Sequence, residues 1–156
     1  MDVVRADYER TLALLAVVDR GGAVPAPGAV QQPAGDASTG AAIFTFVGDN
    51  EAKGVSAAPA VTFHASPSWS ESHWDDDHDA VHALLVEEAN GWLGGRGAIV
   101  ESQIKRWRFA TPRRIWPEPC WRSPEGTLVL AGDAFAGPKV EGAFDSGLAA
   151  ADALAG

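Results

Sequence analysis

A strand, a glycine-bounded turn and a helix follow one another near the end of the sequence, over residues 127–154. Residues 127–131 form a short apolar run that suits a buried strand. Gly132 lets the backbone turn or approach a ligand closely. Asp133 follows at the carboxyl end of the strand, where open α/β sheets bind ligands, and Pro138 suits the first turn of a helix, which needs no proline N–H. The pattern predicts a strand–turn–helix unit that carries one carboxylate in its turn.

The helix is predicted from Val140 onward, because apolar residues recur there at helical spacing. Its N-terminus would offer free N–H groups and roughly half a positive charge, which favours electron-rich groups. One carboxylate beside such donors suits a ligand with hydroxyls and a carbonyl or phosphate. An ordinary strand–turn–helix with a surface Asp133 explains the same residues equally well. The apolar positions are Val140, Ala143, Phe144, Gly147, Leu148, Ala151 and Leu154, and the other face carries Lys139, Glu141, Asp145 and Asp152.

These residues resemble the C-terminal flavin motif of the FAD-dependent amine oxidase superfamily, with the closest similarity to its renalase-like branch. The resemblance implies that Asp133 hydrogen-bonds the ribityl chain of FAD. It also implies that the helix start faces the N1–C2=O edge of the flavin, where the dipole stabilises negative charge by about 0.3–2 kcal/mol. The matching runs are Gly132-Asp133-Ala134-Phe135, Gly137-Pro138-Lys139-Val140-Glu141-Gly142-Ala143 and Ser146-Gly147. The predicted cofactor-binding residues are Gly132, Asp133, Phe135, Val140, Glu141, Gly142, Ala143 and Trp107.

The resemblance extends upstream in the order of the family. Tyr8 and the apolar run after it, residues 49–54, residues 64–70 and the basic–aromatic residues 105–112 resemble parts of the renalase-like substrate domain. The implied fold is α+β: a mixed, largely antiparallel sheet over residues 1–112 and a flavin-facing strand and helix over residues 113–156. Trp107, with Phe135, would line the flavin ring. From its position alone, Trp107 is more simply interpreted as a core residue.

Family members begin with a strand, a Gly-x-Gly-x-x-Gly turn and a helix, which hold the ADP half of FAD. No such turn occurs in this sequence, and Gly95-Arg96-Gly97 follows a predicted helix rather than a strand. The chain therefore resembles the C-terminal half of a family member, with the N-terminal Rossmann half missing. We expect the chain alone to be inactive, and its partners to be an FAD-binding N-terminal half or a second copy of itself.

The implied function is that of an FAD-dependent oxidoreductase. It would transfer hydride from an amine or a dihydronicotinamide-type substrate to the flavin, which oxygen then reoxidises. The flavin carries this chemistry and the protein supplies orientation and electrostatics, so no catalytic acid or base is predicted. Two alternatives remain open: a non-catalytic truncated paralogue or interaction subunit, and one half of a split flavoenzyme.

Composition restricts the partners and the location. A net charge of −9 argues against nucleic acid and anionic membranes as partners, and no apolar run is long enough to span a membrane. Cys120 is the single cysteine, which suits a reducing, cytoplasmic location. His73, His78 and His82 lie near residues 75–77, a run of aspartates, but a solvated helix start explains this cluster better than a metal site does.

The rest of the chain is predicted from periodicity and turn residues. Strands are expected at residues 11–18, 43–47, 60–64 and 98–110. Turns or loops are expected at residues 20–40, 48–54, 66–70 and 111–125. A helix is expected to open within residues 74–78, with Asp75 or Asp76 as its N-cap, to run to Trp92 or Leu93, and to stop at residues 94–97.

Overall fold

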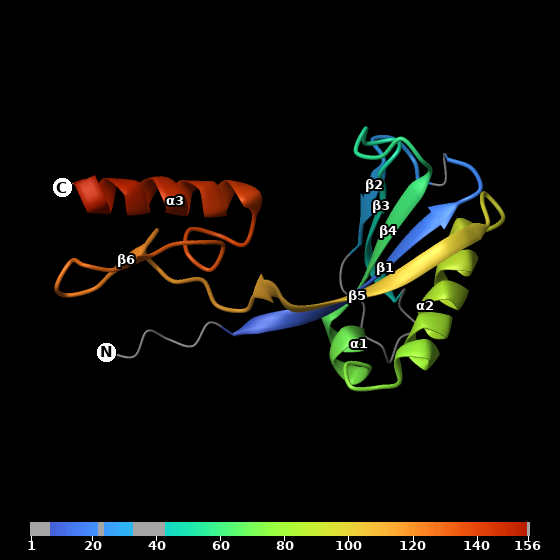
Figure 1. Ribbon diagram of the computed structural model, residues 1–156, viewed down its shortest axis with the longest axis horizontal. Coiled ribbons are helices and arrows are strands. Elements are labelled where there is room, and N and C mark those ends of the chain that lie inside the picture. Colours follow the sequence, from blue (N-terminus) through green and yellow to red (C-terminus); the bar gives the residue numbers. More distant parts are fainter. Residues whose placement is uncertain (1–6, 22–23, 33–42, 156) are drawn as a thin grey trace. The chain divides into compact units, whose positions relative to one another are not determined.

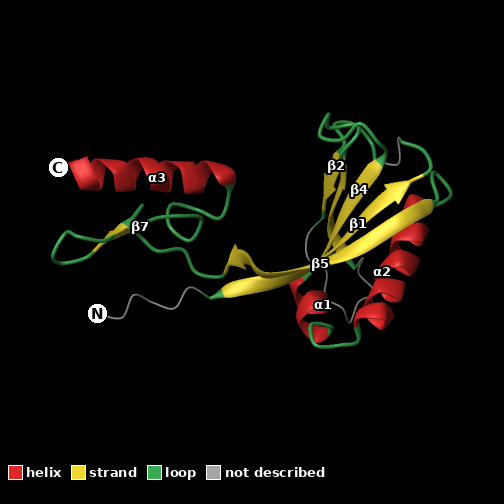
Figure 2. Ribbon diagram, in the orientation of Figure 1, coloured by secondary structure: helices red, strands yellow, loops and turns green. Residues whose placement is uncertain are grey.

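The computed structural model describes residues 7–21, 24–32 and 43–155. The chain divides into two compact units, and each is described by itself. The sheet unit is Arg10–Arg108. The terminal unit combines Met1–Glu9 with Phe109–Gly156, of which residues 7–9 and 109–155 are described. The architecture is mixed α+β (Figure 2).

The sheet unit is built on a five-stranded sheet with the order β2-β3-β4-β1-β5 (Figure 1). The β2–β3, β3–β4 and β4–β1 pairs are antiparallel. The predicted largely antiparallel sheet is thereby confirmed. The strands are β1 (Tyr8–Val18), β2 (Ala29–Gln31), β3 (Phe44–Asp49), β4 (Ala60–Ala65) and β5 (Ile99–Pro112).

Two helices, α1 (Pro67–Ser72) and α2 (His78–Leu93), follow β4 and pack on one face of this sheet. Alternate residues of β1 and β4 point toward α2, since side chains alternate between the two faces of a strand. Trp92 of α2 is partly buried and packs edge-on against Phe63, with ring centroids 5.9 Å apart. The largest fully buried apolar side chains are Phe44, Phe63, Leu12, Leu14, Leu85, Leu93, Val61 and Val81.

The opposite face of the sheet has no helix over it among the described residues of the sheet unit. We call this surface the open sheet face. Thr62 and His64 of β4 lie on it, and both remain partly exposed, whereas Val61, Phe63 and Ala65 on the other side are buried. Within the described sheet unit, one side of the sheet is therefore covered by helices and the other carries partly exposed side chains.

The terminal unit contains a short antiparallel hairpin and a long helix. Strands β6 (Trp121–Arg122) and β7 (Val129–Leu130) pair through Trp121 with Leu130 and Arg122 with Val129. Helix α3 (Val140–Ala155) follows the turn after β7 and contacts that strand. The predicted strand–turn–helix is therefore present, and its helix begins at the predicted residue. The strand is shorter than residues 127–131 and is not buried as predicted: Val129 and Leu130 are half-buried and Leu128 is exposed.

Four local predictions are corrected by the structure. The predicted loop over residues 111–125 contains β6, which is held by pairing with β7. The predicted loop over residues 20–40 contains β2, which is held by pairing with β3; residues 22–23 and 33–40 of that loop lie outside the described residues. The predicted turn over residues 66–70 is the start of α1, because Ser66 Oγ accepts the Trp69 N–H (3.3 Å) and Pro67 occupies the first turn. The N-cap of α2 is Asp77, whose side chain accepts the N–H groups of Asp79 and Ala80. Gly94 ends α2 in the left-handed conformation, as predicted.

Candidate functional site

The turn that carries Asp133 is fixed against the second turn of α3. The N–H of Gly132 donates to Ser146 Oγ at 2.9 Å, and Ser146 is completely buried. On another side of the turn, the Trp116 N–H donates to the Ala134 carbonyl at 2.7 Å. Gly132 has φ +148°, a conformation that favours glycine. The backbone around Asp133 is therefore held in one arrangement from both sides.

Packing inside the terminal unit requires a glycine at position 142, in the first turn of α3. A Cβ at this position would meet the backbone of Gly137, with its carbonyl oxygen 2.5 Å away and its Cα 2.9 Å away. Real Cβ atoms essentially never approach other atoms so closely. Gly142 was predicted as a cofactor-binding residue, and the structure gives this glycine an internal reason: the turn that follows Asp133 closes directly onto the start of the helix at Gly137.

Tyr8 is the partner of the Asp133 carboxylate. Its hydroxyl donates to Asp133 Oδ1 at 3.0 Å across 125 residues of sequence. The Tyr8 ring meets Phe109 edge-on with centroids 5.7 Å apart. The neighbouring Asp7 carbonyl accepts the Arg113 N–H at 2.7 Å. The sequence points to Tyr8 only as the start of an apolar run. Its hydrogen bond to Asp133 could not be predicted, because no local pattern connects residues so far apart.

Tyr8 is the single tyrosine of the chain, so its ionisation can be measured without overlap from the ionisation of another tyrosine. Burial, followed by the hydrogen bond to Asp133 and the nearby charge, raises the pKa of Tyr8 above its usual 10.0. Because the pKa of Tyr8 is raised in the folded protein, the protonated hydroxyl stabilises the folded state below pH 10. This stabilisation is lost as the pH rises through the pKa of Tyr8 in the folded protein. We expect the tyrosinate absorbance of Asp133→Asn to titrate at lower pH than that of the parent chain. Identical midpoints would show that the two side chains do not interact.

The start of α3 offers backbone donors close to the Asp133 turn. The first backbone hydrogen bond of α3 is donated by the Ala143 N–H to the Lys139 carbonyl at 2.9 Å. The N–H groups of residues 140–142 precede that bond and have no acceptor in the helix. Val140 is 90% exposed and Glu141 is exposed, while the other predicted residues of this unit are partly buried: Gly132, Asp133, Phe135, Gly142 and Ala143. The turn and helix start together present a carboxylate and free amides.

Trp107 belongs to the sheet unit, unlike the other seven predicted cofactor residues. Its side chain is 53% exposed, so the interpretation of Trp107 as a core residue is wrong. It lies on β5 beside His64, with ring centroids 6.4 Å apart. Burial and, to a lesser extent, Lys53 lower the pKa of His64 below 6.5. Trp107 therefore borders an uncharged imidazole at neutral pH.

The histidines near the start of α2 are engaged with separate partners. His73 Nδ1 lies 2.8 Å from Asp76 Oδ2, and His82 Nε2 lies 2.8 Å from Ser102 Oγ. The rings of His78 and His82 stack at 6.4 Å. Among the described residues, no three His, Cys, Asp or Glu side chains are grouped so that they could hold a metal ion.

Within the described part of the chain, no helix combines the length and the apolar character needed to cross a membrane. No protein-family model and no curated protein matches the chain. What the chain does must therefore be inferred from its own residues and their arrangement.

Proposed function

We propose that this chain is the flavin-facing, C-terminal portion of an FAD-dependent oxidoreductase. Asp133 accepts hydrogen bonds from the ribityl hydroxyls, and the start of α3 faces the N1–C2=O edge of the isoalloxazine. The observation that supports this most is the attachment of the Asp133 turn to α3 through the Gly132–Ser146 hydrogen bond. This attachment keeps a carboxylate and a helix N-terminus in one fixed arrangement, as a ligand with both hydroxyls and a carbonyl requires.

The donor and acceptor set fits the ribityl and ring portions of FAD. Within the described residues, Asp133 is bonded by Tyr8 through Oδ1, and its Oδ2 bonds none of them. Bound FAD would supply hydride-accepting chemistry toward an amine or dihydronicotinamide-type substrate, with reoxidation by oxygen. The residues of this chain bind and orient the cofactor. The positive end of α3 also stabilises negative charge at the ring edge by about 0.3–2 kcal/mol.

Asp133→Ala should weaken FAD binding by about one to two decades when the chain is combined with a dinucleotide-binding half from a family member. The loss of a hydrogen bond to a charged acceptor costs roughly 1.5–3 kcal/mol. A flavin fluorescence titration measures the change. Asp145→Ala is the matched control, because Asp145 is an exposed carboxylate of α3. Unchanged affinity in Asp133→Ala, or an equal loss in the control, would remove Asp133 from the site.

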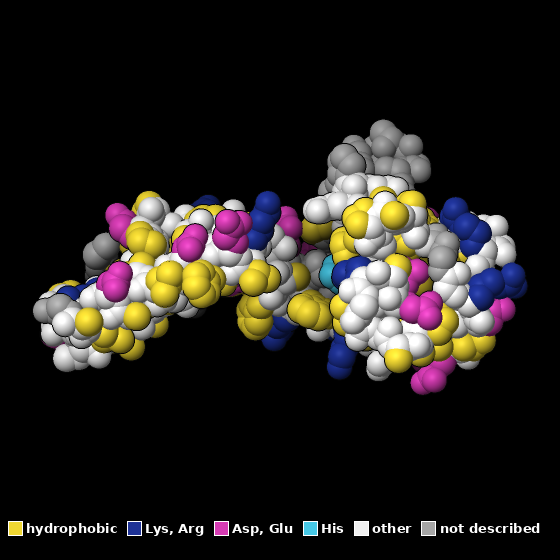
Figure 3. All heavy atoms as spheres, turned by 90° about the horizontal axis from the view of Figure 1, so that it is seen from above, with side chains coloured by type: hydrophobic (Ala, Val, Ile, Leu, Met, Phe, Trp, Pro, Cys, Tyr) yellow, Lys and Arg dark blue, Asp and Glu magenta, His cyan; other side chains and the backbone are white. Residues whose placement is uncertain are grey.

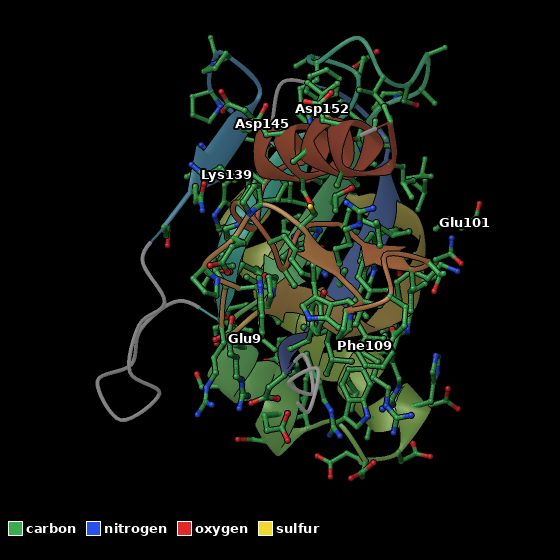
Figure 4. The ribbon with its side chains drawn as sticks, turned by 90° about the vertical axis from the view of Figure 1, so that its left-hand side faces the viewer. Glu9, Glu101, Phe109, Lys139, Asp145 and Asp152 are labelled. Atoms are coloured by element: carbon green, nitrogen blue, oxygen red, sulfur yellow. The ribbon has the colours of Figure 1, made fainter. Side chains whose placement is uncertain are left out.

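A non-catalytic interaction subunit is the second candidate, and the exposure of α3 favours it. The small residues Gly142, Ala143 and Ser146 face inward. The large apolar residues of the helix face outward, with Phe144 64% exposed. Asp145 and Asp152 lie together on another side of the helix (Figure 4), and Figure 3 shows hydrophobic and acidic side chains next to each other over the terminal unit. The exposed apolar residues of α3, called the α3 stripe below, are Val140, Phe144, Leu148 and Leu154.

A further inference from the structure

A histidine and a serine meet where α2 lies alongside β5 (Figure 1). His82, in the second turn of α2, places its Nε2 2.8 Å from the Oγ of Ser102 on β5. Both side chains are partly buried, and Ser102 points to the helix-covered side of the sheet, opposite the open sheet face. A hydroxyl and a histidine nitrogen at about 2.6–3.2 Å have the geometry of a nucleophile and its general base.

The packing of α2 and β5 brings the two side chains together. Val81, the residue before His82, is completely buried, so His82 lies at the margin of the helix face that packs on the sheet. Ile104, two residues after Ser102 and on the same side of β5, packs against the core. The ring of His78 stacks on that of His82. In the tautomer that carries its proton on Nδ1, the imidazole of His82 accepts the Ser102 hydroxyl proton at Nε2.

A cavity of about 330 Å³ opens beside this pair. Both His82 and Ser102 line it, so a molecule in the cavity can reach the serine hydroxyl. Val86 of α2 and Ile99 of β5 supply apolar wall. Glu101 also lines the cavity, and its negative charge disfavours anionic ligands. The volume and the lining therefore suit a small, uncharged, largely apolar molecule.

The edge of β5 supplies backbone donors close to the serine. β5 is the last strand of the sheet, and among the described residues no strand pairs with its outer side. An edge strand presents unpaired N–H groups, and they occur at every second residue. The amide of Ser102 itself or that of a neighbouring residue therefore points outward. Backbone N–H donors of this kind stabilise the oxyanion that forms when a nucleophile attacks a carbonyl.

We propose that Ser102 and His82 form a hydrolytic site for small, uncharged esters. Ser102 Oγ attacks the ester carbonyl carbon, and His82 Nε2 takes the hydroxyl proton. The tetrahedral intermediate then breaks its C–O bond to the alcohol, which leaves with the proton from His82. A water molecule that His82 deprotonates attacks the acyl-serine, releases the carboxylic acid and restores Ser102. Both residues belong to the sheet unit, so this activity goes beyond the proposed flavin function and requires no flavin.

Diisopropyl fluorophosphate tests the site on the full chain, because an activated serine displaces its fluoride and keeps the phosphoryl group. Peptide mass spectrometry should locate the adduct on Ser102. His82→Gln should take the label about 100-fold more slowly, since a general base contributes about that much or more. Ser102→Ala should lose the hydrolysis of p-nitrophenyl butyrate that the parent chain shows. Because both side chains are partly exposed, circular dichroism should show that the two variants stay folded.

Two matched controls separate this pair from the general reactivity of surface histidines and serines. His73→Gln removes a histidine that contacts Asp76, and Ser72→Ala removes a hydroxyl that donates to a backbone carbonyl; both variants should react like the parent chain. The proposal is overturned if Ser102 takes no label, if His82→Gln is labelled as fast as the parent chain, or if Ser102→Ala hydrolyses the ester at the parent rate. None of these results depends on whether FAD binds.

Discussion

Gly142→Ala should destabilise the terminal unit, whereas the same change at Gly147 in the same helix should stabilise it. A methyl group at Gly142 would collide with the Gly137 backbone, and backbone cannot move aside like a flexible side chain. Overpacking of this kind costs about 1–3 kcal/mol. No atom lies within 4 Å of a Cβ at Gly147, so alanine there gains about 0.5–1 kcal/mol of helix stability.

Hydrogen exchange of the α3 amides would measure both effects, because it reports the opening of this helix separately from the sheet unit. Protection should fall in Gly142→Ala and rise in Gly147→Ala. Equal protection in the two variants would mean that the Gly137 turn does not rest on α3. Loss of FAD binding in Gly142→Ala would follow from the displaced turn, so that variant does not report how closely the ring approaches the helix.

The elements predicted best from sequence are those whose local signals agree with one another. The start of α3 at Val140 followed from apolar periodicity together with Pro138, and the end of α2 followed from the glycines at 94 and 95. Strands β1, β3, β4 and β5 were predicted within a few residues, since β-branched and aromatic runs between turn residues mark buried strands. In these segments, local propensity and tertiary packing favour the same structure.

The errors arose where a long-range contact or a choice among similar residues decided the structure. Val30 is in a strand because Val47 of β3 pairs with it, and its own surroundings carry no strand signal. Asp75, Asp76 and Asp77 are equivalent as sequence, but only Asp77 caps α2. Helix α3 packs through Gly142 and Ser146, since small residues allow the Asp133 turn and β7 to approach closely.

The candidate site could be predicted only where its residues are contiguous in sequence. The turn and helix start are contiguous in sequence, so Asp133 and residues 140–143 could be named from the motif. Tyr8 could not be assigned to Asp133, because a hydrogen bond across 125 residues leaves no local pattern. The ring contacts of His64 with Phe46 and Trp107 were missed because these residues meet only after β3, β4 and β5 take their places in the sheet.

The 156-residue chain alone is expected to purify colourless and to release no peroxide from amines or reduced nicotinamides. The affinity of FAD is spread over its adenine, pyrophosphate, ribityl and ring portions. In the proposed site, Asp133 and the start of α3 would contact only the last two, and the sequence contains no Gly-x-Gly-x-x-Gly turn for the pyrophosphate. The flavin absorbance band of the purified protein measures this directly. A monomer that carried stoichiometric FAD and turned over substrate unaided would contradict it.

A dinucleotide-binding half from a family member should restore the flavin colour, and the α3 stripe is the surface that should decide whether it associates. Val140 and Phe144 are exposed apolar residues on one side of this helix, and such patches mark interaction surfaces. Without the second half, the same stripe should cause self-association, which sedimentation velocity would detect. Phe144→Asp should abolish both self-association and flavin capture, because it places a charge within the stripe.

Leu84→Asp is the matched control, since Leu84 is an exposed apolar residue of α2. If Leu84→Asp disrupted association while Phe144→Asp did not, the partner would dock on the sheet unit, and α3 would have no part in holding the flavin-binding half.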